Sequence, residues 1–131
     1  MGKDIYIHVE YRSRNDKKIR HGGEFDGVRV SDFFSVLAGN IYRDAPPLYP
    51  RRGLPGDVTK GVLQQYYKYD HFAPGYVSTS ELKECIDETK RRCNYSDEDD
   101  YLQYYEQIYE YMQEYEDRGE EARMVFWFDQ P

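Results

Sequence analysis

The segment "ARMVFWFD", residues 122–129, is apolar on both faces of the strand that it predicts. Successive side chains of a strand point to opposite faces, so Met124, Phe126 and Phe128 share one face and Val125 and Trp127 share the other. A strand with two apolar faces belongs inside a sheet that is covered on both sides, at least in part. This segment therefore predicts an interior strand.

The N-terminus supplies two further strands. In "DIYIHVEYRS", residues 4–13, apolar and polar side chains alternate with period two, which is typical of a strand. A turn around Asn15 and Asp16 leads to a second strand over about residues 18–25, where Gly22 and Gly23 predict a bulge. We expect the C-terminal strand to lie beside this hairpin.

Four helical stretches separate the hairpin from the last strand, over residues 31–39, 57–68, 78–93 and 97–118. Ser31 and Asp57 are expected N-caps, and Ser78 with Glu81 forms a capping box. The segment "YDHFAPGY", residues 69–76, is expected to be a loop. The chain thus predicts a single α+β domain over residues 1–131, with a small antiparallel or mixed sheet and about four helices packed on one face.

Six tyrosines lie in "YLQYYEQIYEYMQEYE", residues 101–116. At helical spacing, one buried stripe is expected, made of Tyr101, Tyr105, Ile108, Met112 and Tyr115. Tyr104 and Tyr111 form a second stripe that is expected to be exposed. A base-stacking surface would need a positive groove, whereas residues 96–121 carry eleven acidic residues and one arginine. The tyrosine stripe is therefore interpreted as core.

The net charge of −7 is unevenly distributed. Residues 1–60 hold 11 Lys/Arg and 8 Asp/Glu, and residues 61–131 hold 7 and 17. An anionic ligand would favour the first part and a basic partner the second, while duplex nucleic acid is not expected to bind the molecule as a whole. No apolar run long enough for a membrane helix and no signal peptide are visible, so a cytoplasmic protein without membrane attachment is expected.

The spacing of His, Cys and acidic residues matches no known metal cage, and we expect neither a metal nor another cofactor. Cys85 and Cys93 would lie about 12 Å apart on one helix, too far for a disulfide. No glycine-rich phosphate loop is present. The sequence identifies no catalytic triad, although Ser78 or Ser80 with His71 and a carboxylate is kept as a weak alternative.

The strongest chemical signal is a group of basic and aromatic residues in two expected loops. Arginine binds phosphate or carboxylate through a planar fork, helix N-termini attract anions, and tyrosine can stack on a ring. The alternative is that Arg29 and Arg51 form ion pairs with Glu24 or Asp26 that fix the loops. The candidate ligand-binding residues are Asp26, Arg29, Arg43, Arg51, Arg52, His71 and Tyr76.

Three segments, "GGEFDGVRVSDFFSVLAG", "PRRGLPGDV" and "RMVFWFD", together resemble a family of small proteins encoded in phages, prophages and bacterial genomes. The resemblance covers most of the chain and gives a genomic setting rather than a reaction. Two arginines stand where the family has one, and His71 and Tyr76 depart from the segment found there in relatives. The matching positions are Phe25, Asp26, Arg29, Gly53, Leu54, Pro55, Asp57 and Asp129.

This setting suggests a counter-defence protein acting in the host cytoplasm. The leading hypothesis is sequestration, without turnover, of a nucleotide-derived anionic messenger. The first alternative is an acidic protein that inhibits a nucleic-acid-binding host defence protein, using the helix face with Tyr104 and Tyr111. The second is a hydrolase or lyase acting on the messenger, with His71 as acid–base. Homo-oligomerisation is left open.

Overall fold

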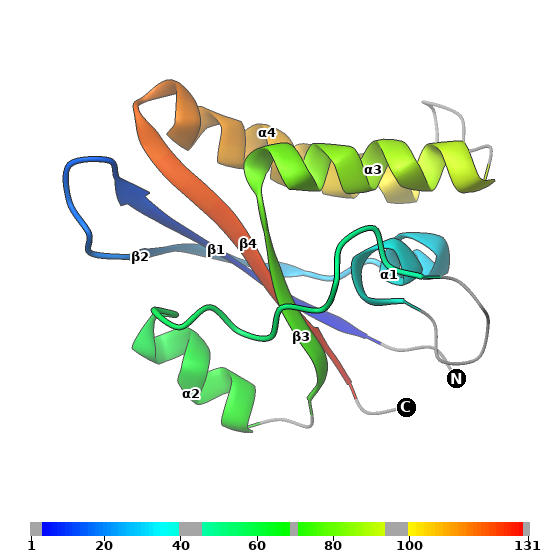
Figure 1. The fold of residues 1–131 in the computed structure, drawn as a ribbon, viewed down its shortest axis with the longest axis horizontal. Helices are drawn as coiled ribbons and strands as arrows, with labels where there is room; N and C mark the ends of the chain where they lie inside the picture. Colours follow the sequence, from blue (N-terminus) through cyan, green and yellow to red (C-terminus); the bar gives the residue numbers. More distant parts are fainter. Residues whose placement is uncertain (1–3, 40–45, 69–70, 94–99, 130–131) are drawn as a thin grey trace.

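The computed structural model describes residues 4–39, 46–68, 71–93 and 100–129, without the side chains of Cys93 and Asp100. Four strands and four helices follow in the order ββααβααβ (Figure 1). The strands are β1 (Ile5–Ser13), β2 (Arg20–Asp26), β3 (Phe72–Ser78) and β4 (Glu120–Phe128), and the helices are α1 (Ser31–Ala38), α2 (Lys60–Lys68), α3 (Thr79–Cys93) and α4 (Asp100–Asp117). The α+β prediction is confirmed.

The strands form an antiparallel sheet in the order β2-β1-β4-β3. β4 lies in the interior beside β1, with Ile5 opposite Phe128 and Ser13 opposite Glu120. The predicted bulge is present, because the β1–β2 register shifts between Val9 and Glu10 as the chain passes Gly22. The interior position expected of the C-terminal strand is therefore confirmed.

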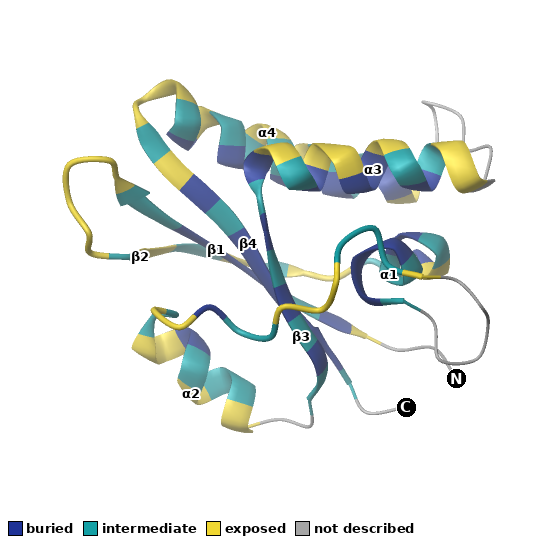
Figure 2. Cartoon of the chain, viewed as in Figure 1, coloured by how far each residue is buried: buried dark blue, intermediate teal, exposed yellow. Residues whose placement is uncertain are grey.

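The first face of the sheet carries the main core. Helices α1, α3 and α4 cover it, and the buried sides of α3 and α4 face the sheet (Figure 2). Ile7, Phe33, Leu82, Ile108 and Phe126 are among its fully or almost fully buried members. Cys85 is packed in this core, and burial raises the pKa of its thiol to about 12.

The second face is covered by α2 and by the segment that precedes it. Val62, Val125 and Trp127 form a smaller buried cluster there, with Leu54, Val58, Tyr66 and Tyr76 packed around it. The expectation that all helices pack on one face is wrong. Trp127 and Val125 are large apolar side chains, so this face of the sheet must also be packed against another layer.

Strand β3 occupies most of the segment that was expected to be a loop. Pro74 lacks a backbone N–H, which is why the sequence did not indicate a strand here. The structure also shows a positive φ of 51° at Ala73, which is unusual in a strand. The sheet tolerates both because β3 is an edge strand, and its register against β4 shifts between Phe72 and Gly75. At Gly75 a Cβ would lie only 2.8 Å from the ring of Phe126, so any larger residue there would displace this buried ring.

Two expected helix caps differ in the structure. Val30, not Ser31, is the N-cap of α1, and no side chain caps that helix. Asp57 binds Arg123 instead of capping α2, and the Glu10 carboxylate accepts the N–H of Thr59 just before that helix. The capping box of α3 is confirmed, since Ser78 and Glu81 bond reciprocally at 2.9 and 3.2 Å.

The buried stripe of α4 is confirmed except at its first member. Tyr105, Ile108, Met112 and Tyr115 are buried, whereas Tyr101 is 65% exposed. The expectation that Tyr111 is exposed is wrong. It packs edge-on against Phe25, and its hydroxyl donates to the carbonyl of Gly22, so it joins α4 to β2.

None of the helices in the described ranges combines the length and apolar character that a membrane span requires.

We predict that Ile108→Ala lowers the free energy of unfolding by roughly 2–4 kcal/mol, because it leaves a cavity in the main core. Tyr101→Ala, on the same helix, should change it by less than about 0.5 kcal/mol, because that ring is exposed. Urea denaturation of both variants measures this difference. Equal losses would contradict the assigned buried face of α4.

Candidate functional site

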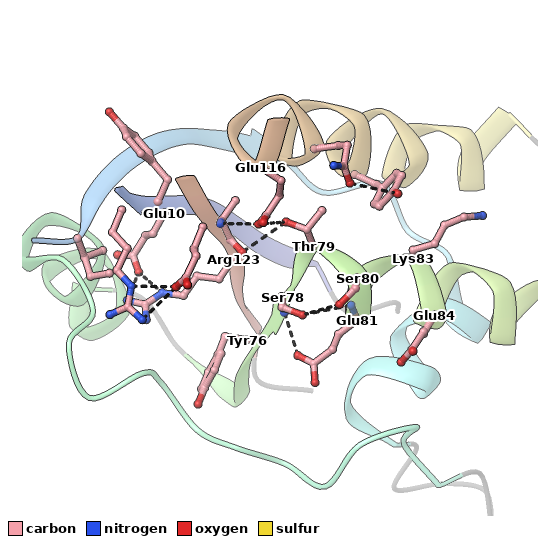
Figure 3. Close-up of a pocket in the computed structure, with 17 residues that line it drawn as sticks. Glu10, Tyr76, Ser78, Thr79, Ser80, Glu81, Lys83, Glu84, Glu116 and Arg123 are labelled. Carbon is pink, nitrogen blue, oxygen red and sulfur yellow. Dashed lines mark hydrogen bonds and ion pairs between the residues drawn. The ribbon is translucent and has the colours of Figure 1, made fainter. Parts of the chain in front are cut away.

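A large pocket lies where β3 ends and α3 begins. Its volume is about 620 Å³, within the range of small-molecule sites. β1 and β4 contribute Glu10 and Arg123, α3 contributes Lys83 and Glu84, and α4 contributes Glu116 (Figure 3). The pocket forms because β3 pairs with β4 only as far as Ser78 opposite Arg123. Beyond that point the outer edge of β4 faces the helices instead of a strand.

Side chains replace the missing strand at this edge. The Glu116 carboxylate accepts the N–H of Ala122 at 2.9 Å, and the Thr79 hydroxyl lies 3.4 Å from the Ala122 carbonyl. Thr79 also donates to Glu116 at 2.9 Å. Both bonds to Glu116 reach the same oxygen, Oε2, and among the described residues Oε1 has no partner. Neutral donors thus hold this carboxylate in place without neutralising its charge.

The three basic residues that line the pocket are each engaged with a carboxylate. Arg12 lies 3.1 Å from Glu121, and Lys83 lies 2.9 Å from Asp87. Arg123 binds the fully buried Glu10 at 2.7 Å and also holds Asp57, whose pKa it lowers.

The acidic lining is only partly balanced by these cations. Arg52 compensates Glu81, but Glu84 and Glu116 have no cationic partner in the described ranges. The lining therefore carries uncompensated negative charge.

The predicted site residue Arg52 forms an intramolecular clamp. Its guanidinium binds both carboxylate oxygens of Glu81 at 2.7 and 2.6 Å and donates to the carbonyl of Tyr76 at 3.2 Å. It also lies over the rings of Tyr49 and Tyr76. Hydrogen bonds from Arg52 lower the pKa of Glu81 to about 2. The position expected for an anionic ligand is thus occupied by a carboxylate of the chain itself.

Two other predicted arginines, Arg51 and Arg29, are also bound within the chain. Arg51 donates to the carbonyl of Ala38 at 2.7 Å and lies over Phe72. Arg29 pairs with Asp4 at 2.8 Å, a different partner from the expected Glu24 or Asp26. The crevice beside Arg51 and Arg52 has a volume of only about 10 Å³. Arg43 lies outside the described residues.

The remaining predicted residues do not converge on one place. Asp26 ends β2, opposite Tyr6 of β1. His71 packs against Tyr66 of α2, with ring centroids 3.9 Å apart, and does not line the large pocket. Of the six candidates that the structure describes, Tyr76 is the one that lines that pocket, and it also borders the small crevice. The structure thus brings together Arg51, Arg52 and Tyr76.

A histidine pair joins β1 to β2. Nδ1 of His8 lies 3.1 Å from Nε2 of His21, and the His8 ring stacks on Trp127 with centroids 5.4 Å apart. His8 is almost fully buried, and this burial lowers its pKa, with Glu24 offsetting part of the shift. No group of three metal-binding side chains occurs within the described ranges.

Sequence reasoning missed the residues that shape the large pocket, Glu116, Glu84 and Arg123. They belong to three elements that are distant in sequence, and no short motif joins them. The one available signal was the acidic character of α4, which identifies a charged helix but not the carboxylate that turns inward.

Comparisons with protein-family models, curated proteins and solved structures gave no significant match. The pocket is therefore interpreted from its own residues.

We predict that Arg52→Ala lowers the free energy of unfolding by roughly 1.5–3 kcal/mol, because it leaves the half-buried Glu81 carboxylate without its charged partner. Arg29→Ala breaks a pair that is about half exposed and should change the free energy by at most about 1 kcal/mol. Thermal and urea denaturation of both variants decide this. A silent Arg52→Ala would show that the clamp does not stabilise the fold.

The lowered pKa of His8 predicts a loss of stability in mild acid. The unfolded chain binds a proton at His8 below about pH 6.5, while the folded chain binds it only at lower pH. The contribution of neutral His8 to the free energy of unfolding is therefore fully present above pH 6.5. It falls below that pH by at most about 1.4 kcal/mol per pH unit for one proton. His8→Gln should show a shallower decline between pH 7 and 5 in urea denaturation. Identical slopes would contradict the assignment.

Proposed function

We propose that this chain is a non-catalytic binding protein whose large pocket takes an arginine or lysine side chain from a basic segment of a protein partner. The observation that carries this proposal is the Glu116 carboxylate, which is fixed by Thr79 and Ala122 and keeps one oxygen without a partner among the described residues. A fixed carboxylate suits a cationic group, since charge-assisted hydrogen bonds are among the strong ones.

The charge and surface of the lining support a cation over an anion. Arg12, Lys83 and Arg123 already hold carboxylates, so a phosphate would have to compete with Glu121, Asp87 and Glu10. The rings of Tyr11, Tyr76 and Tyr109 line the same pocket, and tyrosine faces attract guanidinium and ammonium groups. These features favour the acidic inhibitor over sequestration of a nucleotide.

An enzymatic role lacks a supporting arrangement. The hydroxyls of Ser78 and Ser80 lie 3.3 Å apart in the pocket, but the described lining contains no histidine that could accept a proton from them. His71, the residue expected to act as acid–base, packs against Tyr66 of α2 and does not line the pocket.

The proposed partner is a protein that presents arginine or lysine on an exposed segment. A nucleic-acid-binding protein of a host cell fits this description, because its basic residues contact phosphates. Occupying those residues would block its nucleic-acid contacts. The net charge of −7 would speed the encounter with such a surface.

Calorimetric titration with an unstructured peptide containing four arginines tests the proposal. The same peptide with citrulline, a neutral isostere, is the ligand control, and adenosine triphosphate represents the anionic alternative. We expect binding of the arginine peptide only, weakening as salt rises. Binding of the nucleotide without the peptide would overturn the proposal in favour of sequestration.

Glu116→Gln should weaken peptide binding about ten- to hundred-fold, because it removes a charge-assisted hydrogen bond. Gln retains an oxygen that can accept from Thr79 and Ala122, so the fold should persist. Glu110→Gln removes the same charge from the exposed side of α4 and should have a much smaller effect. Equal losses in the two variants would indicate attraction to net charge alone and would reject a pocket at Glu116.

A further inference from the structure

Two neighbouring side chains on the second face of the sheet, His8 and Trp127, each have a buried polar atom without a partner. In the described part of the chain, three buried side-chain atoms have no hydrogen-bond partner, namely Nε2 of His8, Oγ1 of Thr59 and Nε1 of Trp127. His8 and Trp127 lie on adjacent strands with stacked rings, and Thr59 precedes α2, which covers them. Buried polar groups are nearly always paired, so two such side chains with stacked rings require an explanation.

These atoms define what the layer can bind. The indole N–H of Trp127 can only donate a hydrogen bond, so it needs an acceptor. Gln65 of α2 comes close enough to His8 to affect its pKa, yet Nε2 stays outside hydrogen-bond geometry. Around them lie flat aromatic surfaces, with Tyr6 stacked on Trp127 at 5.7 Å and Tyr66 edge-on to it at 5.3 Å.

The cover of this layer is lightly anchored. Val62 is the one fully buried side chain of α2 in the structure, whereas α1 alone buries four against the first face. Figure 2 shows α2 mostly exposed or half-buried, on the opposite side of the sheet from α3 and α4. Separating α2 from the sheet would therefore uncover fewer buried helix side chains than separating α1 would.

We infer that the layer between the sheet and α2 is a second binding site, for a small planar heteroaromatic molecule that carries hydrogen-bond acceptors. An acceptor atom of this molecule takes the N–H of Trp127, its ring lies among the aromatic side chains, and α2 moves outward to admit it. The site is separate from the pocket proposed for basic segments, which lies at the junction of β3 and α3.

Trp127 reports on this site directly, because it is the single tryptophan of the chain. Nuclear magnetic resonance of the 15N-labelled protein gives one indole N–H signal, which can be followed during titration with three planar probes. Uracil offers carbonyl acceptors, pyrazine offers ring nitrogens, and benzene has the shape of pyrazine without an acceptor. We expect saturable shifts of the indole signal with uracil or pyrazine, and slower exchange of its hydrogen, but no matching change with benzene.

Val62→Ala removes the main anchor of α2 and should tighten probe binding several-fold, because less free energy is needed to move the cover. Glu116→Gln, in the other pocket, should leave probe binding unchanged. An indole signal that does not respond to millimolar uracil or pyrazine overturns the inference, as does an equal response to benzene. If Val62→Ala fails to fold, the titration of the unmodified chain decides alone.

Discussion

The burial of β4 on both faces is the constraint on which the structure depends. Trp127, Phe126 and Phe128 are at most 2% exposed, although they alternate between opposite sides of the sheet. One helical layer cannot cover both sides, so α2 and the segment before it must lie opposite α1, α3 and α4 (Figure 1). The layers on the two faces bury different numbers of side chains, because the first face holds the main core and the second holds a small cluster.

Ion pairs fix the connections between these layers. Arg123 reaches from β4 to the buried Glu10 of β1 and to Asp57, while Glu10 accepts the N–H of Thr59 before α2. Arg52 ties the segment before α2 to β3 and α3 through Tyr76 and Glu81. Each arginine satisfies a carboxylate that burial would otherwise destabilise. As a result, Arg52 and Arg123 are bonded to groups of the chain itself.

Among the described residues, the ion pairs neutralise the positive groups near the large pocket but not all of its carboxylates. Positive groups near the large pocket are engaged, and the fixed carboxylate of Glu116 is not paired with a cation in the described ranges. A ligand must therefore supply positive charge if it is to gain from this pocket. The second face offers the opposite chemistry, with the donor N–H of Trp127 in an aromatic layer. Two chemically distinct sites in one small domain would allow the protein to respond to two ligands.

The sequence by itself determined the interior strand, the hairpin with its bulge, the capping box of α3 and the buried stripe of α4. These features depend on local periodicity and on neighbouring residues, which a sequence displays directly. The sequence did not predict β3, because proline is typical of loops and is compatible with a strand only at a sheet edge. The edge position also tolerates the positive φ of Ala73. Nor could the sequence assign partners to the arginines, since Arg52 and Glu81 are 29 residues apart and Arg123 and Glu10 are 113 apart. Only the tertiary structure decided which charges are neutralised, because pairing depends on distances that folding creates. For the same reason, the sequence could not show that Arg29, Arg51 and Arg52 are bonded within the chain. Nor could it show that the carboxylate of Glu116, on the helix with the tyrosine stripe, is held by Thr79 and Ala122.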